Sequence, residues 1–155
     1  MIVIIEDTRQ KDGKHDIKHR CFDENDVRIT RCKLPYGDYA LPPKIAVDTK
    51  ENMEEIAHNV YTDHTRFRNE CVSALRDGCQ LYVLVENTDG IKAVDEVHKW
   101  VNPELKYRPR AITGERLEKS MKTMTARYGV QFVFCKPEES ALMIIRLLNG
   151  GFDDE

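Results

Sequence analysis

Three short, mainly apolar runs separated by segments of helical spacing constrain the fold of this chain more than any other feature. They cover residues 2–6, 81–85 and 131–135, and the first two lack the polar alternation of a half-exposed strand. Continuous apolar runs of this length are typical of strands that are covered on both faces. Alternation of such strands with helices predicts an α/β fold in which helices flank a mixed β-sheet.

Turn and capping residues predict the remaining elements. Further strands are expected over three segments, which are residues 27–33, the residues at Asp38, and residues 44–50. Helices are expected over residues 52–61, 65–77, 113 onward and 137–148. Gly78 is a natural C-terminal stop, Thr113 a natural N-cap, and Pro137 is suited to a first helical position. Residues 11–25 are expected to be mainly loop with a short helix, and residues 87–110 a short helix with an irregular, basic and mobile loop.

Two carboxylates and a lysine, namely Asp38, Asp48 and Lys50, have a spacing typical of metal-dependent nucleases. Alternate side chains of a strand share a face, so Asp48 and Lys50 should point the same way and Thr49 to the other side. If Asp38 lies on the neighbouring strand, its carboxylate can meet that of Asp48 and form a site for Mg²⁺ or Mn²⁺. Lys50 would then orient an attacking water or offset charge on the phosphate. A solvated edge strand with ordinary surface charges is the alternative.

The chain resembles the nuclease domain of the XPF/Hef family, a branch of the PD-(D/E)xK restriction-endonuclease-like fold. The family motif is Gly-Asp, a short gap, Glu-Arg-Lys, three residues, then Asp. Here the motif is Gly37-Asp38, then Asp48-Thr49-Lys50, then Glu54. The run Asp7-Thr8-Arg9 resembles the family's Asp-x-Arg after the first strand, and Arg66-Phe67 resembles the start of a later helix. The resemblance spans nearly the whole chain.

This resemblance implies a restriction-endonuclease-like fold and a set of site residues. The implied catalytic residues are Asp38, Asp48, Lys50, Asp7 and Glu54. The implied residues at the metal are Asp38, Asp48, Asp7 and Thr49, and the implied nucleic-acid contacts near them are Arg9 and Arg66. Asp48 stands where the family has Glu, Thr49 where it has Arg, and Glu54 where it has Asp. None of these changes removes a metal ligand or the lysine, so the site is predicted to be active.

The implied activity is Mg²⁺-dependent hydrolysis of phosphodiester bonds in branched DNA, with Mn²⁺ as a substitute, during recombination, repair or replication. The sequence does not choose between a flap, a fork and a four-way junction. The alternative is a catalytically inactive DNA-binding or scaffold subunit of the same fold. The resemblance also leads us to expect a homodimer, with branch recognition supplied by the dimer, by a protein partner or by the basic loop. Compact enzymes of this kind resemble those of bacteria and phages, which predicts the cytoplasm of a bacterial or phage-infected cell.

Composition fits one domain over residues 1–149 with a short acidic tail over residues 150–155. A chain of 155 residues is long enough for one core, and it has no apolar run long enough to cross a bilayer. Five cysteines without a Cys-x-x-Cys pair favour reduced structural thiols. His15 and His19 lack a complementary ligand pair, so a polar hydrated loop is predicted there rather than a zinc site.

The distribution of charge favours a polyanionic partner, although the net charge of the chain is −3. Residues 99–127 contain eight basic and three acidic residues, a net charge of +5, so the rest of the chain carries −8. A basic stripe on an acidic body suits DNA held near a carboxylate-rich site. The predicted DNA contacts in this stripe are Arg108, Arg110, Arg116 and Lys119. A solvated helix face is the alternative, and Trp100 and Tyr107 are expected to pack in a core or loop rather than stack on a base.

Overall fold

A computed structural model describes residues 2–10, 13, 15–41 and 45–150. Its centre is a six-stranded sheet in the order β2-β1-β3-β4-β5-β6. The strands are β1 Ile2–Asp7, β2 Val27–Cys32, β3 Tyr39–Leu41, β4 Ile45–Lys50, β5 Gln80–Glu86 and β6 Gln131–Cys135. Strand β3 runs antiparallel to both of its neighbours, whereas β1 with β2 and β4 with β5 and β6 are parallel. The predicted mixed sheet is therefore confirmed.

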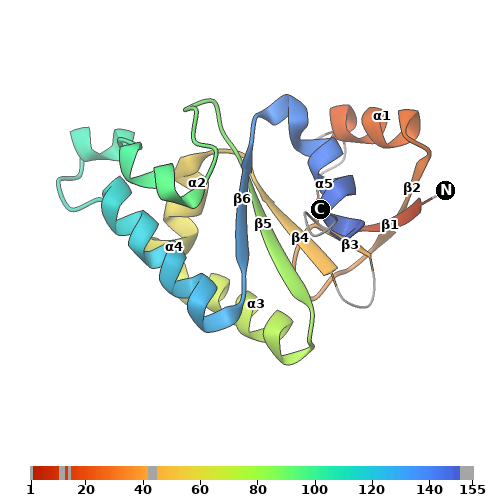
Figure 1. The fold of residues 1–155 in the computed structure, drawn as a ribbon, viewed down its shortest axis with the longest axis horizontal. Helices are drawn as coiled ribbons and strands as arrows, with labels where there is room; N and C mark the ends of the chain where they lie inside the picture. Colours follow the sequence, from red (N-terminus) through yellow and green to blue (C-terminus); the bar gives the residue numbers. More distant parts are fainter. Residues whose placement is uncertain (1, 11–12, 14, 42–44, 151–155) are drawn as a thin grey trace.

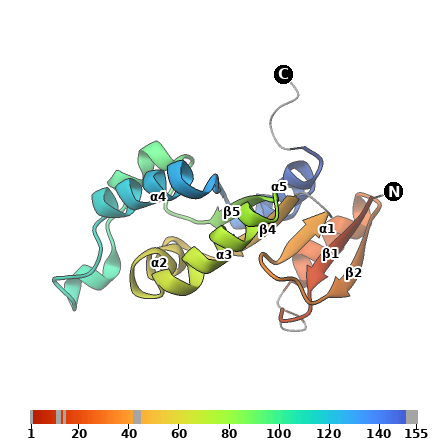
Figure 2. The ribbon, with the colours of Figure 1, turned by 90° about the horizontal axis from the view of Figure 1, so that it is seen from below.

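Helices cover both faces of this sheet (Figures 1 and 2). One face carries α2 (Met53–Ala57), the π-helical turn η1 (His58–Thr62), α3 (His64–Arg76) and α4 (Gly114–Tyr128). The other carries α1 (Asp16–Glu24) and α5 (Ser140–Leu148), the latter preceded by the 3₁₀ turn η4 (Pro137–Glu139). The acidic tail predicted over residues 150–155 lies outside the described residues except for Gly150.

Each helical layer forms its own apolar core against the sheet. The first core contains side chains of α2, α3 and α4 packed on β4, β5 and β6, among them Met53, Ile56, Phe67, Leu117, Met121, Val83 and Phe132. The second contains side chains of α1 and α5 packed on β1, β3 and β4, among them Phe22, Ile144, Leu147, Ile4, Tyr39 and Val47. All five cysteines are free thiols. Among the described residues, no helix is both long and apolar enough to span a bilayer.

Helix α1 is the short helix predicted within residues 11–25, but it is longer than expected, and the polar hydrated loop predicted around His15 and His19 is wrong. His15 is buried, and its Nδ1 lies 2.5 Å from the Tyr39 hydroxyl. His19 Nε2 lies 2.5 Å from an oxygen of the buried carboxylate of Glu6. Phe22 packs edge-on against the Tyr39 ring. The segment has few apolar residues, so its helix is stabilised mainly by these contacts with the sheet, which a local pattern does not reveal.

Residues 87–110, where the sequence predicts a short helix and an irregular basic loop, are partly helical. They contain two 3₁₀ helices, η2 (Val94–Lys99) and η3 (Pro103–Lys106), at the end of the molecule opposite α1 and β2 (Figures 1 and 2). Val97 and Trp100 are buried in the first core, as the packing interpretation of Trp100 predicted, whereas Tyr107 is exposed. The Asn102 side chain also donates to the Ile112 carbonyl at 2.9 Å. Burial of Trp100 and the hydrogen bond of the buried Asn102 side chain thus stabilise the conformation of this segment.

Gly114 is the position where α4 meets this segment most closely. A Cβ atom there would lie 2.4 Å from the Trp100 carbonyl oxygen and 2.7 Å from that of Val97. We therefore expect Gly114→Ala to lower the free energy of unfolding by about 1–3 kcal/mol, because backbone must move to admit the methyl group. Urea unfolding monitored by circular dichroism measures this change. Ser120→Ala, which adds no atom to the same helix, should leave the midpoint within error, and equal midpoints for both variants would contradict the prediction.

Candidate active site

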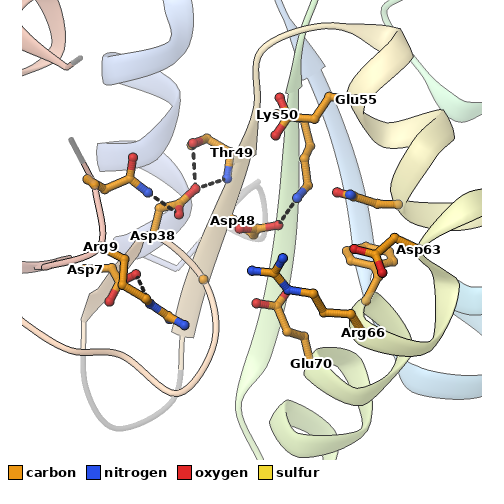
Figure 3. Close-up of a pocket in the computed structure, with 14 residues that line it drawn as sticks. Asp7, Arg9, Asp38, Asp48, Thr49, Lys50, Glu55, Asp63, Arg66 and Glu70 are labelled. Carbon is orange, nitrogen blue, oxygen red and sulfur yellow. Dashed lines mark hydrogen bonds and ion pairs between the residues drawn. The ribbon is translucent and has the colours of Figure 1, made fainter.

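A polar cavity of about 260 Å³ lies where β3 and β4 face α2 and α3 (Figure 3). It collects side chains from the loop after β1, from β4, and from the helices α2 and α3. The lining residues are Asp7, Arg9, Gln10, Gly37, Asp38, Asp48, Thr49, Lys50, Glu55, Asn59, Asp63, Arg66, Phe67 and Glu70. We call it the acidic cavity. It brings together most of the residues that the sequence motif singled out.

The pairing of β3 with β4 places Asp38 beside Asp48. Tyr39 is the partner of Val47 in the antiparallel register, so one further step sets Asp38 opposite Asp48. The Asp38 backbone N–H donates to the Val47 carbonyl at 2.8 Å, and the Asp7 N–H donates to the Asp38 carbonyl at 2.7 Å. Asp38 is thereby fixed between two strands.

Gly37 makes this close approach possible. Its φ of +75° lies in the left-handed region, and a Cβ atom would lie 3.1 Å from the Val47 carbonyl oxygen. A residue with a side chain would be strained and crowded at this position. The glycine of the Gly-Asp motif therefore serves to bring the following aspartate against β4.

Thr49 and Gln10 hold the Asp38 carboxylate. Its Oδ2 accepts hydrogen bonds from the Thr49 backbone N–H and from the Thr49 hydroxyl, both at 2.7 Å, and Oδ1 accepts one from the Gln10 amide. Thr49 points to the other side of β4 from Asp48 and Lys50, as the strand period predicts, and its hydroxyl meets Asp38 there (Figure 3). Asp38 precedes the first residue of β3, so its carboxylate lies at the end of the strand pairing, where Thr49 can reach it.

Asp48 and Lys50 share a face of β4, as the strand period predicts, and they form an ion pair. Lys50 Nζ lies 2.8 Å from Asp48 Oδ2 and 5.5 Å from the centre of the Phe67 ring. Both side chains are buried. Burial by itself would lower the pKa of Lys50, but the charge of Asp48 and its hydrogen bond raise it above its ordinary value. Lys50 is therefore a fixed positive charge on the wall of the cavity.

Glu70 is a further carboxylate of the cavity that lies close to Asp48, and the sequence analysis missed it. It lies on α3 one helical turn after Arg66, and both side chains point toward Asp48 (Figure 3). Burial and the negative charge of Asp48 raise the pKa of Glu70 to about 7. The same two causes raise the pKa of Asp38 to about 7. The spacing of four residues from Arg66 would have identified Glu70, because residues i and i+4 share a helix face.

Glu54 and Asp7, which the resemblance implies as catalytic residues, do not have the surroundings expected for that role. Glu54 does not line the cavity, whereas Glu55 does. Successive helical residues differ by about 100° in direction, so only one of two adjacent glutamates can face the site. Asp7 lines the cavity, but Oδ1 accepts from the Leu34 N–H at 2.9 Å and Oδ2 from Arg9 Nε at 2.7 Å. In this structure Asp7 thus positions Arg9 and the Leu34 backbone.

The predicted basic stripe is divided between two places, and neither is the acidic cavity. Arg108 and Arg110 line a small cavity together with His58 and Glu104. Arg116 and Lys119 line a separate hollow between α3 and α4. The division follows from the chain path, since the first pair lies after η3 and the second on α4.

The donors in the acidic cavity fit a hard divalent cation. Among the described residues, no three acidic, histidine or cysteine side chains are already grouped closely enough to hold a metal. However, Asp48 Oδ2 is fully buried and accepts no hydrogen bond within the described part of the chain, apart from its ion pair with Lys50. Buried carboxylates with raised pKa values would be stabilised by a cation, and oxygen donors are those that Mg²⁺ and Mn²⁺ prefer. Asp38, Asp48 and Glu70 are the residues that could hold one.

Comparisons with known proteins agree with this fold. The family model described as the ERCC4 domain matches residues 6–147. The structure is similar to XPF from Aeropyrum pernix in complex with DNA, with a TM-score of 0.69 and 19% identity over 96% of this chain. A second structure of XPF from Aeropyrum pernix gives a TM-score of 0.67 and 19% identity over 95% of this chain. The chain spans 64% and 63% of the lengths of these two structures. No curated protein matches it in sequence.

The crowding of carboxylates predicts how stability depends on pH in the absence of metal. The folded-state pKa values of Asp38 and Glu70 lie above their ordinary values, so the folded protein binds more protons than the unfolded chain between about pH 4 and 7. Their contribution to stability is present at low pH and is lost as the pH rises through 7. Asp48→Asn removes one cause of both shifts, so the loss of stability between pH 5 and pH 8 should shrink, by on the order of 1 kcal/mol.

Thermal and urea unfolding in EDTA at the two pH values measures this difference. Asp89→Asn is the matched control, since the same change is made on an exposed residue outside the cavity. An identical pH dependence for wild type and Asp48→Asn would show that the three carboxylates do not interact.

Proposed function

We propose, from the premise that this chain belongs to the ERCC4 domain family, that it is a Mg²⁺-dependent endonuclease that hydrolyses phosphodiester bonds in branched DNA. One observation carries the proposal. Asp38, Asp48 and Glu70 share one cavity with the buried ammonium of Lys50, which lies 2.8 Å from Asp48. Hard oxygen donors beside a fixed cation are what metal-assisted phosphodiester hydrolysis requires.

Several side chains of the cavity have a role in this proposal. A Mg²⁺ ion held by Asp38, Asp48 and Glu70 would polarise the phosphate and activate water, and Mn²⁺ would substitute for it. Lys50 stabilises negative charge that develops on the phosphate, because it is already desolvated and fixed by Asp48. Thr49 keeps the Asp38 carboxylate in place through two hydrogen bonds. Asp7 contributes by orienting Arg9.

Arg9 and Arg66 are proposed to bind the phosphates on either side of the bond that is cut. Arg9 Nε is bound to Asp7, and another guanidinium nitrogen donates to the Leu34 carbonyl at 2.7 Å, so its direction is fixed. Arg66 enters from α3, on the opposite wall (Figure 3). A phosphodiester placed between the two arginines would lie against the carboxylates and Lys50. Arg108, Arg110, Arg116 and Lys119 are proposed as DNA contacts farther from the reaction.

The setting of this activity is part of the same proposal. We take the substrate to be a flap, fork or junction formed in recombination, repair or replication, and the place to be the cytoplasm of a bacterial or phage-infected cell. A second copy of the chain, or a protein partner, would add contacts to the branch. XPF from Aeropyrum pernix, whose structure was determined with DNA, supports the choice of nucleic acid.

Asp48→Asn should abolish metal binding and cleavage together. The change keeps the volume of the side chain but removes the charge that makes it a cation ligand. Calorimetric titration with Mn²⁺ and single-turnover cleavage of a labelled fork measure the two properties. Asp89→Asn should bind and cut as the wild type does. Cleavage by Asp48→Asn at the wild-type rate would place the reaction elsewhere, and no cleavage of any DNA by the wild type would favour the inactive DNA-binding or scaffold alternative.

Lys50→Ala should separate binding from chemistry. Metal affinity should stay the same or rise, since a positive charge next to the carboxylates is removed. The single-turnover rate should nevertheless fall by roughly 10²-fold or more, because the lost charge acts in the transition state. Lys92→Ala, a change of an exposed lysine, is the control. Loss of Mn²⁺ binding with no separate effect on the saturated rate would remove Lys50 from the chemistry.

A further inference from the structure

A basic groove between α3 and α4 is the most prominent feature that the cavity mechanism leaves unused. It has a volume of about 620 Å³, and none of its lining residues is acidic. Its cationic or titratable side chains come from both helices and are His64, Arg68, Arg116, Lys119 and Arg127. We call it the α3–α4 groove. It extends the basic stripe by two residues, His64 and Arg68, that lie far from the stripe in sequence.

The positive charges of α4 are aligned along the groove. Lys119 lies three residues after Arg116, and Arg127 lies eleven residues after it. At about 100° per residue, these spacings place all three side chains on one stripe of the helix. Glu118 lies on another side, where it pairs with Lys122 at 3.2 Å. The distance along the axis from Arg116 to Arg127 is about 16 Å. At about 3.4 Å per nucleotide of a duplex strand, this length matches roughly five phosphates.

The charge of the groove is not paired with carboxylates among the described residues. No ion pair within the described part of the chain includes Arg68, Arg116, Lys119 or Arg127. The contacts that two of them make are with neutral aromatic groups. Arg68 Nε donates to the Tyr128 hydroxyl at 3.0 Å, and the Arg116 guanidinium lies 5.8 Å from the centre of the Tyr61 ring. These contacts limit the motion of the side chains and leave their charge available to a ligand.

Helix α3 separates this groove from the acidic cavity. Arg66, Phe67 and Glu70 line the cavity, whereas His64 and Arg68 line the groove. An α-helix with its side chains is about 10–12 Å thick. Two segments of nucleic acid, one in the cavity and one in the groove, would therefore be separated by the thickness of this helix. A branched substrate meets this condition, since its arms diverge.

We propose that the α3–α4 groove binds the phosphate backbone of a second arm of branched DNA while the first arm is cut at the acidic cavity. The inference rests on the proposed nuclease function and names a determinant of its substrate. A regular row of arginine and lysine without an acidic residue suits evenly spaced phosphates, and no base-reading carboxylate or amide lines the groove. Binding there would be independent of sequence, and the two-sided arrangement would favour branches over linear duplex.

The test compares a fork with a linear duplex that has the same number of base pairs. The variant Arg68→Gln/Arg127→Gln removes one charge from each wall of the groove. The control is Arg20→Gln/Arg28→Gln, which removes two exposed charges from α1 and β2, at the other end of the sheet (Figure 1). Dissociation constants are measured by fluorescence anisotropy in Ca²⁺ over a series of salt concentrations, and thermal unfolding checks that each variant is folded.

In the groove variant, the slope of log affinity against log salt should become shallower on the fork by about 1.8, which is about 0.9 for each lost phosphate contact. The slope on linear duplex should change by less than half as much, and the control should follow the wild type on both DNAs. Equal changes on fork and duplex, or no change on either, would overturn the assignment to a second arm. Loss of poly-L-glutamate binding with unchanged fork affinity would instead assign the groove to an acidic protein.

Cleavage in Mg²⁺ separates this inference from the nuclease proposal. If the wild type cuts neither DNA but the groove variant shows the fork-selective change in binding, the groove stands and the nuclease proposal fails. If the wild type cuts the fork and the groove variant binds and cuts it equally well, the nuclease proposal stands and the groove assignment fails.

Discussion

Repulsion among three carboxylates is the constraint on which the rest of this molecule depends. Asp38, Asp48 and Glu70 come from a turn, a strand and a helix, and the fold holds them in one partly buried cavity. Such an arrangement is unfavourable without positive charge, and burial together with the negative charge of Asp48 raises the pKa values of Asp38 and Glu70 to about 7. Lys50 offsets part of this charge. The remaining demand for a cation is what makes the cavity suited to a metal-assisted reaction.

The backbone and side chains around the cavity hold the Asp38 carboxylate in place despite the neighbouring negative charge. Gly37 lets Asp38 lie against β4, and Thr49 supplies two donors to its carboxylate. On the opposite face of the sheet, the buried carboxylate of Glu6 contacts His19 and Arg31, and that of Glu86 contacts Lys18. Buried charges on the α1 side are thus paired by neighbouring cations. In the acidic cavity, by contrast, the carboxylates outnumber the cations, which are Arg9, Lys50 and Arg66.

Helix α3 forms one wall of both the acidic cavity and the α3–α4 groove. Its cavity side carries Arg66 and Glu70, and its groove side carries His64 and Arg68. A change in the position of this helix would therefore act on the proposed metal site and on the proposed second DNA contact together. The helix is anchored by Phe67, Cys71 and Ala74, which are buried in the first core. Packing of the apolar side of α3 thus positions both the acidic cavity and the α3–α4 groove.

The sequence by itself determined the sheet, the family resemblance and the central motif. Strand and helix patterns are local properties, so the continuous apolar runs at residues 2–6 and 81–85, separated by segments of helical spacing, were enough to predict a mixed sheet flanked by helices. The strand period put Asp48 and Lys50 on one face. What only the tertiary structure decided depends on contacts between distant segments. Glu70 lies in the cavity because α3 packs on β5, the strand next to β4, and α1 is held by contacts of Phe22 and His15 with Tyr39. The basic stripe was divided, and part of it gained His64 and Arg68, because α3 lies along α4. Local patterns fix which way a side chain points from its own strand or helix, but not which other elements it meets.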